Sequence, residues 1–72
     1  MIEVPIRINA DTIGTVEIRR THTRANGLHY YDWHLYEGGT ISAEGALYHA
    51  EEMGAYVLVA AVMNQVVAWM LR

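Results

Sequence analysis

A long apolar segment near the C-terminus limits the folds that this chain can adopt. Between positions 53 and 71 only Asn64 and Gln65 are plainly polar, so a helix here has no broad charged face to turn toward water. Two glutamates precede the segment and Arg72 follows it, an order that suits the dipole of a helix at both ends. We therefore predict a helix over about 51–71.

Two environments are able to cover such a helix. Nineteen residues span about 28 Å, nearly the hydrocarbon core of a bilayer, so a transmembrane anchor over 53–71 is one hypothesis. The central Asn-Gln pair and the absence of lysine or arginine just before the segment favour the other hypothesis, in which one helix face packs on a sheet and the other on a second copy of the chain. The chain is then a dimer or tetramer. The expected interface residues are Tyr56, Val59, Val62, Met63, Val66, Trp69 and Met70.

Size and composition also favour self-association. A chain of 72 residues forms one domain and buries only about 60% of its surface on folding, yet 53% of its residues are hydrophobic and 18% charged. The sequence has no cysteine, which excludes disulfides, thiolate zinc sites and a cysteine nucleophile. We expect a second copy of the chain to cover the remaining apolar surface.

Alternation of apolar and polar residues predicts an antiparallel sheet before the helix. Pro5 cannot donate to a strand ladder, so the first strand is expected at an edge. Asn26-Gly27 and the glycine pair 38–39 supply turn residues. The expected strands cover about 2–9, 13–21, 29–36 and 40–49.

The fourth strand has a competing interpretation. Small and apolar residues over 43–54 also recur at helical spacing behind a candidate Ser42 cap, which gives three strands and one long helix. Gly45 weakens a helix, and bulky Trp33 opposite small residues suits a sheet, so four strands are favoured. The expected fold is a single α+β domain over 1–72, an antiparallel meander with one face covered by the C-terminal helix.

The expected loop lengths also predict which residues pair across neighbouring strands. A loop over 10–12 pairs Val4 with Ile18 in the first hairpin. A three-residue loop around the two glycines pairs Trp33 with Ala43 in the last hairpin.

Basic and aromatic residues form the candidate binding site. Arginines with an imidazole gather on the second strand and the loop after it, and they suit contacts with phosphate oxygens. Pairing with neighbouring acids is the plainer interpretation of these arginines. Exposed tyrosines stack on nucleotide bases and are also enriched at protein-binding hot spots. The candidate residues are Arg19, Arg20, His22, Arg24, Tyr30, Tyr36 and Tyr48.

Neither catalysis nor a bound metal is expected. Asp32 and His34 share one strand face, which is the start of a general-base arrangement, but no hydroxyl nucleophile with a recognisable motif accompanies them. His29 and His34 point to opposite faces of the strand, which suits no shared ion. A net charge of −3 argues against a long nucleic acid as partner. We expect no enzyme activity and no cofactor.

Four runs of the sequence, 13–18, 31–35, 45–49 and 54–58, read IGTVEI, YDWHL, GALYH and GAYVL. With them the chain resembles small proteins of unknown function encoded by actinobacterial phages. The resemblance implies a non-essential accessory protein in the host cytoplasm and carries no catalytic signature. A cytoplasmic location also agrees with an N-terminus that has no apolar signal-peptide core.

The sequence thus favours a non-enzymatic, homo-oligomeric binding module. Its expected partner is a host protein or a small anionic, nucleotide-like ligand. The protein is the safer expectation because no glycine-rich phosphate loop accompanies the arginines. The alternative is a small membrane protein anchored by 53–71.

Overall fold

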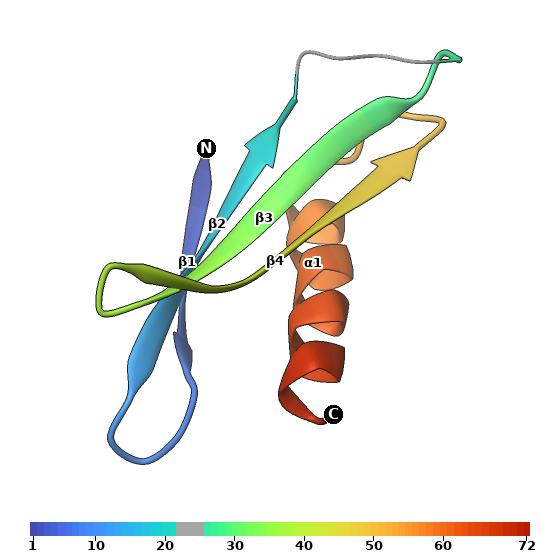
Figure 1. Ribbon diagram of the computed structural model, residues 1–72. Helices are drawn as coiled ribbons and strands as arrows, with labels where there is room; N and C mark the ends of the chain where they lie inside the picture. Colours follow the sequence, from blue (N-terminus) through green and yellow to red (C-terminus); the bar gives the residue numbers. More distant parts are fainter. Residues whose placement is uncertain (22–25) are drawn as a thin grey trace.

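The computed structural model describes residues 1–21 and 26–72 and shows a four-stranded antiparallel sheet with one helix packed against it (Figure 1). The strand order is β1-β2-β3-β4, a simple meander, which confirms the expected α+β fold and the edge position of the strand that contains Pro5. The elements are β1 (Ile2–Arg7), β2 (Ile13–Arg20), β3 (His29–Glu37), β4 (Thr40–His49) and α1 (Ala55–Met70).

The core lies between the sheet and α1. Alternate residues of β2 and β3 point inward, and α1 meets them with three residues spaced four apart, which places all three on one side of the helix. Their burial in one layer holds the two elements together. The buried residues are Val16, Ile18, Tyr31, Trp33, Leu35, Leu58, Val62 and Val66.

Residues 40–49 form a strand, so the alternative with three strands and one long helix is wrong. Gly45 lies directly opposite Trp33 in the β3–β4 ladder. A Cβ atom on Gly45 would lie 2.6 Å from Nε1 of Trp33, which means that the indole ring occupies the space above the glycine. The glycine that weakens a helix here makes room for the largest side chain of the core.

The first hairpin has a different register from the expected one. Val4 pairs with Val16 and not with Ile18. The reason is the loop, which closes earlier than expected, because the Ile8 N–H donates to the Thr12 carbonyl at 2.9 Å. A shift of two residues keeps the same side chains on the inner face, so the pattern of burial is unaffected.

The last hairpin also closes differently. Gly38 and Gly39 form a two-residue turn with φ values of 58° and 84°, conformations that glycine adopts without strain. The expected three-residue loop is therefore wrong, and so is the pairing of Trp33 with Ala43. An irregularity in the ladder lies instead between Leu35 and Tyr36.

The helix begins at Ala55 and not near residue 51, so the acids before it are outside its first turn. Contacts with the sheet hold the connection from β4 in a non-helical path. The Met53 N–H donates to the Tyr31 hydroxyl at 2.8 Å, and Glu52 pairs with Arg20. In the part of the chain that the structure describes, no helix is both long and apolar enough to cross a membrane.

Gln65 fixes the middle of α1 to the sheet. Its Oε1 accepts a hydrogen bond from Nε1 of Trp33 at 2.7 Å, and its Nε2 donates to the Ala46 carbonyl at 3.4 Å. The neighbouring Asn64 is exposed. The two polar residues of the helix therefore have opposite roles, one in the core contact and one on the surface.

Candidate binding face

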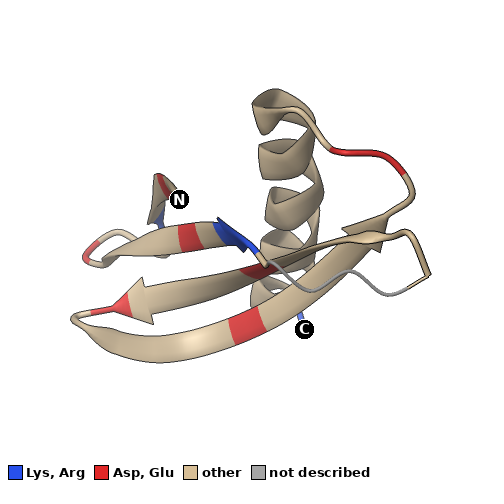
Figure 2. Cartoon of the chain, turned by 90° about the horizontal axis from the view of Figure 1, so that it is seen from above, with Lys and Arg blue, Asp and Glu red and all other residues tan. Residues whose placement is uncertain are grey.

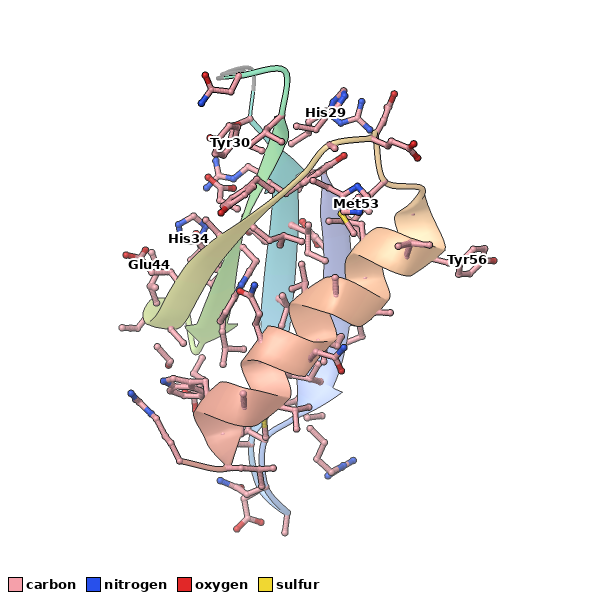
Figure 3. The ribbon with its side chains drawn as sticks, turned by 90° about the vertical axis from the view of Figure 1, so that its right-hand side faces the viewer. His29, Tyr30, His34, Glu44, Met53 and Tyr56 are labelled. Carbon is pink, nitrogen blue, oxygen red and sulfur yellow. The ribbon has the colours of Figure 1, made fainter. Side chains whose placement is uncertain are left out.

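The candidate site is the sheet face opposite α1, which we call the outer face. It is formed by the alternate residues of β2, β3 and β4 that do not enter the core. No element among residues 1–21 and 26–72 covers it, and in Figure 3 Tyr30, His34 and Glu44 lie away from α1. Its residues are Ile13, Thr15, Glu17, Arg19, Tyr30, Asp32, His34, Tyr36, Ile41, Glu44, Ala46 and Tyr48.

Aromatic rings lie at both ends of the outer face. Tyr30 and Tyr48 are directly opposite in the ladder, with ring centroids 5.6 Å apart, and Tyr48 is 63% exposed. At the other end the rings of His34 and Tyr36 lie 6.3 Å apart. Tilted rings at these separations attract each other, so the tyrosines form a preorganised surface and lose little freedom on contact with a partner.

A polar cluster centred on His34 lies between the Tyr30–Tyr48 pair and Tyr36. Nη2 of Arg19 lies 3.5 Å from Nδ1 of His34, and Nε2 of the same imidazole lies 3.4 Å from Oε2 of Glu44. A neutral His34 satisfies both contacts if Nδ1 accepts from the guanidinium and Nε2 carries the proton toward the carboxylate. The imidazole thus connects β2 to β4 across β3.

Asp32 completes the cluster, and one of its carboxylate oxygens accepts no hydrogen bond from the described residues. Its Oδ1 is shielded from solvent and has no hydrogen-bond partner among the described residues, and the nearest cationic group, Nε of Arg19, is 4.0 Å away. The carboxylate borders a shallow hollow of about 410 Å³ that is also lined by His34 and Glu44. Because this oxygen itself is shielded, a partner's N–H or O–H group meets the carboxylate through its accessible part; the Asp32 side chain is 37% exposed.

The structure does not bring the candidate arginines together. Arg20 follows Arg19 in the strand and therefore lies on the opposite, inner side of the sheet. There it pairs with Glu52, and its guanidinium carbon lies 5.9 Å from the centroid of the Tyr31 ring. Figure 2 shows these basic residues at the end of β2 and the acidic residues on the connection before α1. The candidates His22 and Arg24 lie outside the described residues.

The three candidate tyrosines, Tyr30, Tyr36 and Tyr48, all lie on the outer face, as does Arg19. Two exposed apolar residues of this face, Ile13 at 61% and Ile41 at 47%, were not among the candidates. Ile41 lies opposite Tyr36, which extends the apolar end of the face. Alternation within β2 was a sufficient signal for Ile13, whereas the position of Ile41 depends on the irregular ladder.

The candidate oligomer interface needs a correction. Val62 and Val66 are 0% exposed within a single chain because they pack against the sheet, so they form no surface for a second copy. Val59, Met63 and Trp69 are partly buried and pack against the same core.

Other apolar residues in the helix and directly after it are exposed. Tyr56 is 94% exposed and points away from the helix in Figure 3. Met70 is 37% exposed, and Val57, Val67 and Leu71, which the sequence analysis did not select, are 61%, 46% and 80% exposed. Since the helix is apolar on all sides, its sequence has no signal for the side that meets the sheet.

Metal-ligating residues do not gather on the described part of the chain, where no group of three or more His, Cys, Asp or Glu side chains is placed to hold an ion. The chain matches no protein-family model, no curated protein and no solved structure.

Proposed function

We propose that this protein is a small, non-enzymatic, homo-oligomeric binding module whose outer face binds another protein. The observation that carries the proposal is the outer face itself, an uncovered sheet surface with the Tyr30–Tyr48 pair at one end, Tyr36 at the other and the polar cluster around His34 between them. Tyrosine and arginine in this arrangement are typical of protein-binding hot spots, where exposed rings supply contact area and central polar groups supply orientation.

The charges of the outer face favour a protein over a small anionic ligand. Arg19 lies among carboxylates, with Asp32 at 4.0 Å and Glu44 joined to it through His34. Arg20 is on the inner side and is already paired with Glu52. A phosphate group on the outer face would meet more negative than positive charge, whereas a partner's N–H groups or cations would meet suitable acceptors.

The resemblance to actinobacterial phage proteins supplies the setting of the proposal. An accessory protein of this kind works in the host cytoplasm, so a host protein is the proposed partner. A small nucleotide-like anion is the second version of the proposal, and it requires that Arg19 leave its acidic neighbours.

The test is capture of partners from an actinobacterial extract by the intact protein. We expect Tyr48→Ser to lose a captured protein that the unchanged chain retains, because the ring is removed from the exposed pair while the core is untouched. The matched control is Tyr56→Ser, which removes an even more exposed ring, 94% against 63%, from a position on the helix outside the outer face. Equal capture by the Tyr48 variant and the unchanged chain would overturn the proposal.

The anionic version has its own test. A ligand that binds the native state raises the melting temperature by an amount that grows with its concentration. We expect no such increase with a panel of nucleoside mono-, di- and triphosphates. A reproducible increase that Arg19→Gln abolishes would replace the protein partner with an anionic ligand.

A further inference from the structure

The exposed side of α1 carries a regular apolar seam. Five exposed residues, opposite the side that packs on the sheet, follow one another at alternating spacings of three and four. This spacing is the one with which helices pair by inserting side chains between one another. The seam residues are Val57, Ala60, Asn64, Val67 and Leu71.

The seam offers large apolar side chains to a partner. Val57, Val67 and Leu71 are 61%, 46% and 80% exposed, and Met70 beside them is 37% exposed. Apolar side chains grouped in this way on a surface mark an interaction site. Between Ala55 and Met70 the helix has no charged residue, so two copies of the seam meet without repulsion.

The charges at the two ends of α1 distinguish the two orientations of a helix pair. Glu51 precedes the helix and Arg72 follows it, whereas Glu52 is already paired with Arg20. A parallel pair places Glu51 beside Glu51 and arginine beside arginine, whereas an antiparallel pair brings Arg72 of each chain toward the end of the helix pair that carries Glu51 of the other. The antiparallel pair also aligns the helix dipoles favourably.

We propose that the cover of this seam is a second copy of the chain, bound through an antiparallel pair of α1 helices that cross at Asn64. Asn64 is the centre of the seam, with Val57 and Leu71 each about 10 Å along the axis on either side. Around a two-fold axis at this point Asn64 meets the partner's Asn64, and Val57 meets the partner's Leu71. The outer faces of both chains stay free for binding.

This inference rests on the homo-oligomer part of the proposed function and names its interface and orientation. The first experiment measures native mass by light scattering for the unchanged chain and for Ala60→Glu, which places two charges in the seam of a pair. We expect a dimer that this variant reduces to half its mass with the helix content unchanged in circular dichroism. The control, Ala10→Glu, makes the same change in the exposed β1–β2 loop and leaves the dimer intact.

The outcomes separate the two proposals. A monomeric unchanged chain overturns both the seam and the homo-oligomer, while the Tyr48 capture experiment still tests the outer face. An oligomer that Ala60→Glu does not dissociate overturns the seam only.

Cysteine cross-linking tests the orientation, because the natural chain has no cysteine. Val57→Cys and Leu71→Cys chains, mixed and oxidised, form a disulfide between the two variants in an antiparallel pair, where these positions meet. Val57→Cys alone then forms none, because its two copies are about 20 Å apart, far beyond disulfide reach. Efficient cross-linking of Val57→Cys alone would overturn the antiparallel pair.

Discussion

Replacement of Gly45 by alanine is expected to destabilise the protein through one contact. The new Cβ atom would lie 2.6 Å from Nε1 of Trp33 and 2.8 Å from Cε2 and Cζ2 of the same ring. Atoms of this kind attract at about 3.5–4.0 Å, so the ring has to move by roughly 1 Å. It has little room to do so, because Trp33 is 3% exposed and its Nε1 donates to Gln65.

The expected loss of stability follows from three contributions. Overpacking of a core costs about 1–3 kcal/mol, and disruption of the Trp33–Gln65 hydrogen bond costs about 1 kcal/mol more. The lower chain entropy of alanine in the unfolded state returns about 0.5–1 kcal/mol. The net loss is about 2 kcal/mol, which lowers the melting temperature of a domain of this size by about 8–16 °C.

Thermal unfolding followed by circular dichroism, at one protein concentration for all variants, measures this loss. Gly54→Ala is the matched control, because nothing lies within 4 Å of the position of its new Cβ. A Trp33→Phe background removes the three nearest ring atoms, so Gly45→Ala is expected to cost little there. An equal cost of Gly45→Ala in both backgrounds would refute the packing argument, since contacting residues do not behave additively.

Three further outcomes follow from other contacts. Gln65→Leu leaves the buried Nε1–H of Trp33 without an acceptor and is expected to cost about 1–3 kcal/mol in urea unfolding; a cost below 0.5 kcal/mol would contradict the role of this bond. Arg20→Gln removes a half-exposed ion pair with Glu52, so we expect a loss of less than about 1 kcal/mol that disappears in high salt. Val62→Ala creates a cavity and is expected to lower stability by about 2 kcal/mol without dissociating the dimer; dissociation with unchanged stability would return this residue to the interface.

The sequence was sufficient for the elements of the fold because each has its own local signal. Period-two alternation identified the first three strands, Pro5 identified the edge, and the turn glycines with Gly45 favoured the fourth strand. The competition between strand and helix over 40–49 was resolved correctly by Gly45, which is unfavourable in a helix and fits beneath Trp33 in the sheet.

The registers were not predictable in the same way. Composition indicated where each loop lies but not its length, which depends on individual hydrogen bonds and dihedral angles. The bond from Ile8 to Thr12 and the positive φ angles of Gly38 and Gly39 moved both hairpins away from the expected pairs. The contact of Trp33 with Gly45 and the cluster around His34 are consequences of these registers.

The residues of the binding face were likewise predictable only in part. Alternation alone places Tyr30 and Tyr36 on one side of β3, and it separates Arg19 from Arg20 wherever the strand continues through both. The two arginines were predicted as one patch because the strand end and the loop after it carry most of the basic residues. The structure shows that Glu52, which is distant in sequence, holds Arg20 on the inner side.

Two properties of α1 follow from its amino-acid sequence alone. It has no charged face, and whichever side stays uncovered is apolar, because both statements hold for any rotation of the helix about its axis. The rotation itself follows from packing in the folded chain, which turns Val62 and Val66 toward the sheet and Asn64 outward. A uniformly apolar helix has no preferred side of its own, so partners in the sheet, among them Trp33 through its hydrogen bond with Gln65, set this rotation.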